Sequence, residues 1–142
     1  MISEIFDTLG KVILTILLSS LIGTEREYRH KEAGLKTHIL VAVGSCLIVL
    51  TSFHVFDIYK NISHIDPTRL MAGIITGIGF LCGGTIIRAG NQVTGLTTAA
   101  ALWTVAGIGM AVGAGHYSAA ILFTVVIFTV LVGLRRLESR LK

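Results

Sequence analysis

The chain has 142 residues, of which 53% are hydrophobic and 14% are Asp, Glu, Lys or Arg, and its mean hydropathy is +0.81. Soluble domains carry about 25% charged residues, so this balance excludes an ordinary soluble domain and indicates an integral membrane protein. We interpret the net charge of +4 as a matter of membrane orientation and not of nucleic-acid binding, because the positions of Lys and Arg orient membrane proteins.

Five apolar segments follow one another along the chain, and each is about as long as a helix that crosses a bilayer. The expected spans are residues 5–24, 35–56, 69–88, 97–115 and 117–134. Asp66 followed by Pro67 predicts the start of the third helix. The short connection after that helix predicts that the third and fourth helices are antiparallel neighbours. Residues 1–142 are therefore predicted to form a single transmembrane domain, an all-α membrane protein folded as a compact bundle of five transmembrane helices.

Most of the 12 Lys and Arg residues fall on one side of these spans. That side holds Arg26, Arg29, Lys31, Lys36, Arg88, Arg135, Arg136, Arg140 and Lys142, and the other holds Lys11, Lys60 and Arg69. Because cytoplasmic loops are enriched in Lys and Arg, we expect the N-terminus outside and the C-terminus in the cytoplasm. The charged connection at residues 24–32 is then cytoplasmic. Its four-residue spacings predict helical ion pairs from Glu25 to Arg29 and from Glu27 to Lys31.

Small residues form stripes at helical spacing on the third and fourth segments. The predicted packing positions are Gly73, Gly77, Gly79, Gly83, Gly84, Ala100, Thr104, Gly107 and Ala111. Gly and Ala let helix backbones approach closely within lipid, so this pattern predicts Gly/Ala-rich packing of helices 3 and 4. The alternative is that the glycines make room for a ligand or a permeating ion. The fifth segment is apolar nearly all round, which predicts that it faces lipid.

Charged and hydroxyl side chains gather at the segment ends on the cytoplasmic side. We expect Glu25, Arg26, Arg88, Thr97 and Thr98 to form one polar cluster there, with Glu25 held between the two arginines. An ionic side chain at membrane depth is expensive and therefore marks a functional site. The alternative for each residue is that it reaches out to the lipid headgroups.

Candidate groups for chemistry are few. Glu25 and Glu27 are weak candidate Mg²⁺ ligands, because this ion needs only one or two carboxylates besides water, although the neighbouring arginines oppose a cation. Cys46 and Cys82 are expected to be buried apolar groups, because neither has CxxC spacing. The five histidines, His30, His38, His54, His64 and His116, are interpreted as surface or interface residues. With no P-loop or hydrolase motif, the sequence predicts neither an enzyme nor a bound cofactor.

Four ordered blocks make the chain resemble a known family. They are residues 21–27 (LIGTERE), 33–38 (AGLKTH), 77–88 (GIGFLCGGTIIR) and 95–103 (GLTTAAALW). These blocks are similar to the signature segments of the MgtC/SapB family of bacterial inner-membrane proteins. Several relatives carry Asn where this chain has Thr97, and Cys where it has Thr104.

The resemblance implies a five-span membrane domain linked to growth and virulence when magnesium is scarce. Members are described as restraining the membrane ATP synthase, and older naming calls them magnesium-transport proteins. Many relatives add a cytoplasmic C-terminal domain of ACT-like fold, and we expect the 142 residues here to hold the transmembrane domain only.

Two functions of different classes follow. The favoured one is a non-enzymatic regulator in the bacterial cytoplasmic membrane that acts in magnesium homeostasis. Its small-residue helix faces would dock on a membrane partner such as the ATP synthase, or on a second copy in a homo-oligomer. The alternative is a small transporter or channel for Mg²⁺ or another ion, formed by an oligomer. The packing stripes favour the first, because a transport path would need polar groups through the membrane midplane, where the residues are mostly Gly, Ala and Ile.

Overall fold

The computed structural model describes residues 2–62, 64 and 66–141, with side chains up to residue 134. Five helices and one two-stranded hairpin make up this part of the chain. In chain order they are α1 (Ile2–Tyr28), α2 (Leu35–Tyr59), α3 (Thr68–Thr85), β1 (Ile87–Ala89), β2 (Gln92–Thr94), α4 (Leu96–Gly113) and α5 (Tyr117–Leu141). Lys142, one of the predicted cytoplasmic cations, lies outside the described residues.

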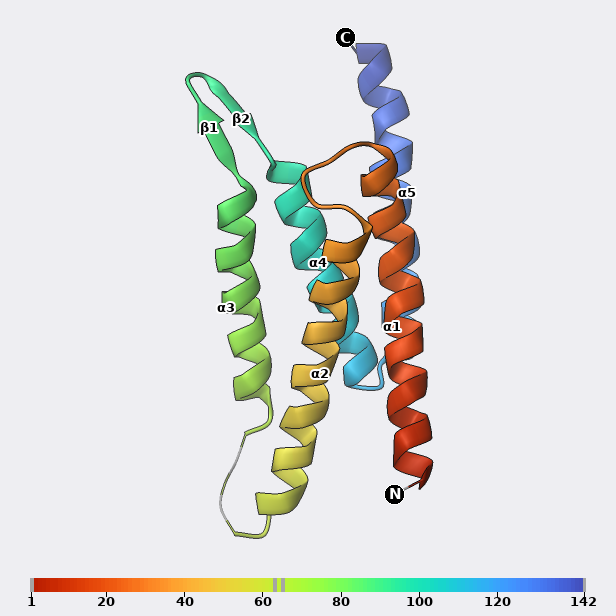
Figure 1. Ribbon diagram of the computed structural model, residues 1–142, viewed down its shortest axis with the longest axis vertical. Coiled ribbons are helices and arrows are strands. Elements are labelled where there is room, and N and C mark those ends of the chain that lie inside the picture. The colour runs from red at the N-terminus through yellow and green to blue at the C-terminus, as the bar shows by residue number, and fades with distance from the viewer. Residues whose placement is uncertain (1, 63, 65, 142) are drawn as a thin grey trace.

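Successive helices run in opposite directions, so the two chain ends lie at opposite ends of the bundle (Figure 1). Helix α4 contacts each of the other four helices and is the centre of the bundle. The helices α1, α2, α4 and α5 are long and apolar enough to cross a membrane. Helix α3 has 18 residues and runs beside α4, as the short connection predicted. The prediction of an all-α membrane protein with five helices is confirmed.

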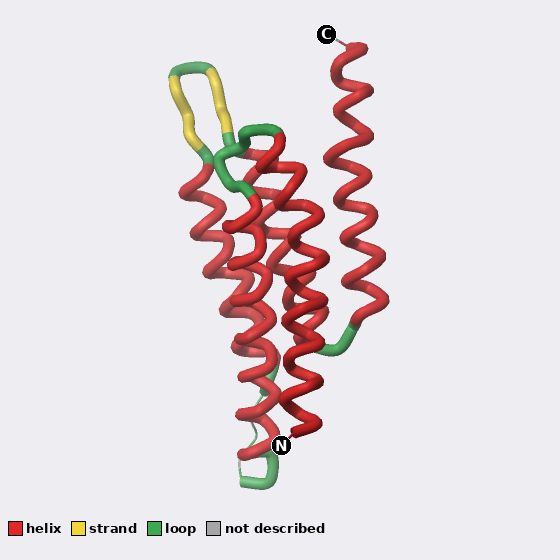
Figure 2. Tube along the Cα trace, turned by 45° about the vertical axis from the view of Figure 1, so that its right-hand side comes forward, coloured by secondary structure: helices red, strands yellow, loops and turns green. Residues whose placement is uncertain are grey.

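One end of α3 lies where the local sequence predicts it, and the other does not. The amide and hydroxyl of Thr68 donate to Asp66 Oδ1 at 2.8 and 2.7 Å, so this carboxylate holds the first residue of α3 near the predicted start, although the N-cap position is Pro67. At the other end the expected helix to residue 88 is wrong, because the helix ends at Thr85. The next residues form an antiparallel hairpin, the yellow segment of Figure 2, which turns at Gly90 with a φ of 61°. Consecutive β-branched residues before a glycine turn favour a hairpin.

Helix α4 packs against α2 through two glycines that the stripe analysis left out. A Cβ at Gly109 would lie 2.1 Å from the carbonyl oxygen of Ala42, and one at Gly113 would lie 2.9 Å from that of Cys46. Both distances are shorter than real Cβ atoms show, so only glycine lets the two backbones come this close. Small residues therefore do line the packed face of α4, but these two glycines are not among the predicted ones.

Most residues of the predicted stripes face away from the bundle. A Cβ at any of six predicted glycines would meet no heavy atom within 4 Å, namely Gly73, Gly77, Gly79, Gly83, Gly84 and Gly107. Ala100 is exposed and Thr104 is only partly buried, whereas Ala111 is partly buried and packs against the core. The predicted packing within the chain is therefore wrong for the six glycines and for Ala100, but Ala111 does contact the core.

Larger side chains explain which face of α3 and which face of α4 turn toward the core. In α3, Ile74 and Cys82 are buried and Ile78 packs against the core, and these three positions repeat every four residues. In α4, Leu102 and Val105 are fully buried. Burying a branched hydrocarbon side chain brings more contact than burying a glycine, so these residues decide the orientation of each helix.

Helix α5 has a narrow inner face and a broad outer one. Ala120 and Thr124 are buried, and Ile127 and Leu131 pack on the core at the same helical spacing. Many other large apolar residues of this helix are exposed, as predicted for a lipid-facing segment. Its last turns extend past the neighbouring end of α1 (Figure 1).

Candidate functional site

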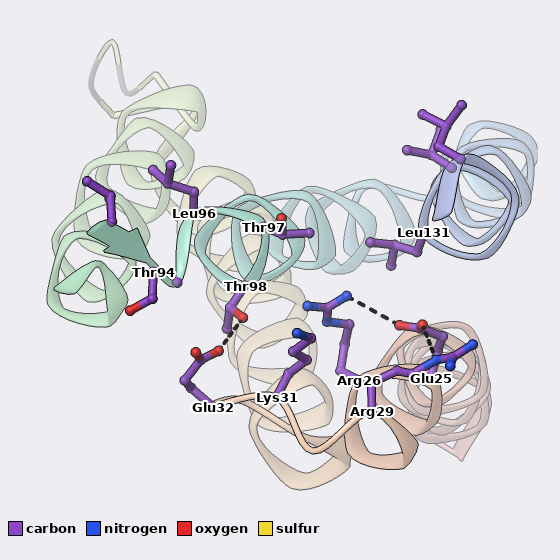
Figure 3. A pocket seen from close by; sticks show the side chains of 14 residues that line it. Glu25, Arg26, Arg29, Lys31, Glu32, Thr94, Leu96, Thr97, Thr98 and Leu131 are labelled. Atoms are coloured by element: carbon purple, nitrogen blue, oxygen red, sulfur yellow. Dashed lines mark hydrogen bonds and ion pairs between the residues drawn. The ribbon is translucent and has the colours of Figure 1, made fainter. Parts of the chain in front are cut away.

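A polar cavity of about 730 Å³ lies at the end of the bundle where α1 ends and α4 begins. The charged connection after α1, the first turn of α4 and the apolar side of α5 form its walls (Figure 3). Its lining residues are Glu25, Arg26, Arg29, Lys31, Glu32, Val93, Thr94, Gly95, Leu96, Thr97, Thr98, Val130, Leu131 and Leu134. Four of the five residues of the predicted cluster line this one cavity: Glu25, Arg26, Thr97 and Thr98.

Glu25 is held by two arginines, but one of them differs from the prediction. Arg26 Nη1 lies 3.4 Å from Glu25 Oε2, and Arg29 Nε donates to Glu25 Oε1 at 3.3 Å. The Glu25 side chain is only 7% exposed, so this carboxylate depends on its cationic partners. The predicted helical pair of Glu25 and Arg29 is confirmed.

Arg88 is not a partner of Glu25, and the predicted bridge between them is wrong. This arginine lies on β1, is exposed, and donates from Nε to the carbonyl oxygen of Gly90 at 3.4 Å. The reason is twofold: α3 ends early, which places residue 88 on the projecting hairpin, and α3 packs against α4 and α2.

Glu27 and Lys31 are also placed differently from the prediction. The carboxylate of Glu27 accepts the amide of Leu35 at 2.8 Å and thereby caps the start of α2. A Cβ at Gly34 would lie 1.7 Å from this carboxylate oxygen, so the glycine leaves room for the cap. Helix α1 ends at Tyr28, before the turn that the predicted pair of Glu27 and Lys31 requires. Lys31 instead lies in the connection and lines the cavity.

The sequence analysis missed the residue that joins the charged connection to α4. The Thr98 hydroxyl donates to Glu32 Oε2 at 2.7 Å across a separation of 66 residues. This hydrogen bond is the main reason why the pKa of Glu32 lies below its ordinary value of 4.5, and the charges of Lys31 and Arg26 lower that pKa further. Glu32 therefore stays ionised at neutral pH. The predicted residue Thr98 thus has a specific role, whereas Thr97 is exposed beside it.

Two buried nitrogen atoms have no hydrogen-bond partner among the described residues: Nε of Arg26, which lines the cavity, and Nε2 of His38. Arg26 is only 4% exposed although it is a cation. His38 is fully buried and its Nδ1 lies 2.8 Å from the carbonyl oxygen of Gly34, which corrects its interpretation as a surface or interface residue. A buried polar atom without a hydrogen bond is costly, so a hydrogen-bond partner at either atom would stabilise the fold.

The two weak candidate Mg²⁺ ligands point to different partners. Glu25 binds arginines and Glu27 caps α2, so the two carboxylates do not face one common point. In the described part of the chain no three His, Cys, Asp or Glu side chains are grouped to hold a metal ion. Both cysteines are buried, which agrees with their interpretation as packing residues.

Known proteins are similar to this chain over most of its length. The model of the MgtC family matches residues 12–140. Protein SapB of Bacillus subtilis (strain 168) is 45% identical over 118 residues, which cover 80% of this chain and 50% of SapB. Protein MgtC of Salmonella typhimurium (strain LT2) is 39% identical over 136 residues, which cover 96% of this chain and 56% of MgtC.

A third relative is the "Putative magnesium transporter YhiD" of Escherichia coli (strain K12), 38% identical over 133 residues, which cover 92% of this chain and 62% of YhiD. The chain thus spans between half and two thirds of the length of these relatives. No solved structure matches it. The family match covers all the cavity residues and all five helices, apart from the first ten residues of α1 and the last residue of α5. The chain therefore belongs to the MgtC family.

Proposed function

We propose that the protein is a non-enzymatic membrane regulator that acts in adaptation to low magnesium through contacts between helices in the bilayer. The observation that supports this most directly is the outward small-residue face of α3. Gly73, Gly77 and Gly84 lie open on the helix, whereas Ile74 and Ile78 turn toward the core. In lipid, helices associate by close backbone approach, and an uncovered face of this kind suits another helix.

The family relation supplies the link to magnesium. The relatives include proteins named MgtC and one named "Putative magnesium transporter YhiD". We further propose a location in the bacterial cytoplasmic membrane with the N-terminus outside. The end of the bundle that carries Arg26, Arg29, Lys31 and Lys36 would face the cytoplasm, in agreement with the positive-inside rule.

A pair of matched glycine variants tests this function. Gly77 and Gly44 both have open space where a side chain would begin, but Gly44 lies on α2 and outside the stripe. We expect Gly77→Leu to prevent the protein from supporting growth in low-magnesium medium, because a bulky side chain keeps a partner helix away. Gly44→Leu is expected to support growth. Both must accumulate in the membrane at the normal level. Normal growth with Gly77→Leu would contradict the proposal.

Crosslinking identifies the occupant of the face. A thiol at Gly77→Cys would be reached by a membrane-permeant crosslinker, whereas Cys46 and Cys82 are buried. A crosslinked dimer shows a homo-oligomer, and a specific adduct with a subunit of the ATP synthase shows the partner that the family resemblance implies. Leu122→Cys on the exposed side of α5 is the control position. A monomer at both positions would argue against docking at this face.

The second candidate is a transporter for Mg²⁺ or another ion, and the name of the Escherichia coli relative favours it. The buried hydroxyls in α1 give little support to a transport path, because those of Thr15 and Ser19 already donate to carbonyls of their own helix, at 2.8 and 2.7 Å. Purified protein in liposomes containing a magnesium dye separates the two functions. Saturable uptake that Glu25→Gln abolishes and Glu27→Gln leaves intact would establish transport and displace the regulator.

A further inference from the structure

We propose that the cavity at the first turn of α4 binds a phosphate group, held between Arg26, Lys31 and the first backbone amides of α4. The proposal concerns binding by this chain alone, so it does not rest on the regulatory function above. Three features of the site support it: a buried guanidinium with a free donor, an uncapped helix start, and two cations that point into the same space.

Arg26 is the buried feature that calls for a ligand. Its side chain is 5% exposed, and its closest carboxylate oxygen, on Glu25, lies at the long distance of 3.4 Å. The guanidinium offers five N–H donors, and that of Nε finds no acceptor in the described part of the chain. Figure 3 shows this group between Glu25 and the first turn of α4, inside the cavity. Because Arg26 lines the cavity, an anion there would accept from its guanidinium and balance its buried charge.

The start of α4 presents amide groups to the same space. The residue before the helix is Gly95, with a φ of 85°, and no side chain caps the helix. The first helical hydrogen bond runs from the amide of Ala99 to the carbonyl of Gly95 at 2.8 Å, so the amides of residues 96–98 precede the helical ladder. The Thr98 hydroxyl is turned to Glu32. Free amides and the helix dipole together favour an anion at such a helix start.

Gly95 also fixes where the helix begins. A Cβ there would lie 1.9 Å from the carbonyl oxygen of Thr85, so the glycine lets the chain pass close to the end of α3. Residues other than glycine rarely adopt a positive φ of this kind. The uncapped amides are therefore held at the cavity by the packing of α3 and not by a flexible loop.

Charge in the cavity favours an anion over a cation. The lining includes Arg26, Arg29 and Lys31 against the carboxylates of Glu25 and Glu32. Both carboxylates already have partners, whereas Lys31 makes no side-chain hydrogen bond or ion pair among the described residues. In Figure 3 the side chains of Arg26 and Lys31 both point toward α4. Two cations directed at one space repel each other unless an anion lies between them.

A phosphate group fits these donors better than a carboxylate does. The donors reach the cavity from three directions, namely the guanidinium of Arg26, the ammonium of Lys31 and the backbone of α4, and the tetrahedral oxygens of phosphate can accept from all three. Val130, Leu131 and Leu134 form an apolar wall on the remaining side. This wall suits the apolar part of a phospholipid, and a free phosphate is the other source of the same chemistry.

The test measures binding to the purified full chain and three charge variants. Inorganic phosphate is titrated calorimetrically into protein in a zwitterionic detergent, and retained phosphatidylglycerol is counted by native mass spectrometry after delipidation and reloading. Lys31→Gln should weaken binding about tenfold, because a charge-assisted contact is lost. Glu32→Gln should tighten it, because a carboxylate next to the anion is neutralised while the acceptor for Thr98 is kept. Lys36→Gln, an exposed cation outside the cavity, should leave binding unchanged.

Lys31 is exposed, so its variant tests the site without the risk that replacement of buried Arg26 prevents folding. Binding of inorganic phosphate with this pattern identifies a free anion as the ligand, and the same pattern for phosphatidylglycerol alone identifies a lipid headgroup. Either result supports the site. Absence of binding for both probes, or equal binding by Lys31→Gln and Lys36→Gln, overturns it.

Discussion

Replacing Gly109 with alanine tests how the bundle is held together. In α4 this residue faces α2, and the added methyl carbon would lie 2.1 Å from the carbonyl oxygen of Ala42. Real Cβ contacts stay above 3.0 Å, so the two helices would have to separate by about 0.9 Å. The obstacle is a backbone atom in the middle of a helix, which cannot turn aside as the end of a side chain can.

We expect Gly109→Ala to lower the free energy of unfolding by about 1–3 kcal/mol or more, the range for one extra methyl group in a well-packed interior. Gly107→Ala is the matched control, two residues away on the same helix, where a Cβ meets nothing within 4 Å. That variant should be neutral or gain about 0.5–1 kcal/mol, because alanine is the better helix former. Reversible unfolding in mixed detergent, followed by circular dichroism, measures both. Equal stability of the two variants would refute the inferred contact between α4 and α2.

Three further results are expected. The pKa of Glu32 is lowered in the folded protein, so its hydrogen bond with Thr98 adds stability above about pH 4.5, and this stability is lost as the pH falls through the folded pKa. Thr98→Val should therefore make stability depend less on pH in this range, as acid denaturation measures. Acid denaturation curves that do not change in this variant would contradict the hydrogen bond. The thiols of Cys46 and Cys82 should react with maleimide only after unfolding, as mass spectrometry can show, and rapid labelling of the native protein would contradict their burial. Glu27→Ala should lower the midpoint of thermal unfolding because the first amide of α2 loses its cap, and a normal midpoint would show that the cap is dispensable.

Features set by neighbouring residues were predictable from the sequence. The five helices follow from apolar runs of suitable length, and the hydrogen bond of Asp66 at the start of α3 and the pair of Glu25 and Arg29 follow from spacings of two and four residues. Four of the five expected cluster residues line one cavity for a similar reason, since alternating helix directions bring the end of α1 and the start of α4 to one side.

Features that depend on distant neighbours were not predictable in this way. The hydrogen bond between Thr98 and Glu32 joins residues 66 positions apart, and nothing in either segment indicates the other. Arg88 was expected beside Glu25 because an apolar run suggested a longer helix, and a local preference for a hairpin moved it away. His38 sits in an apolar run like many exposed residues, and only its neighbours make it buried.

The sequence by itself determined that this is a membrane protein of five helices with its cations gathered toward one end. Hydropathy and charge are properties of consecutive residues, so they do not depend on which helices become neighbours. Tertiary structure alone decided which glycines touch a neighbour: Gly109 meets the backbone of α2, while Gly77 lies open on the outside of α3. Both are glycines in apolar helices, and the rotation of each helix is set by the sum of its contacts with all the others. That sum exists only in the folded bundle.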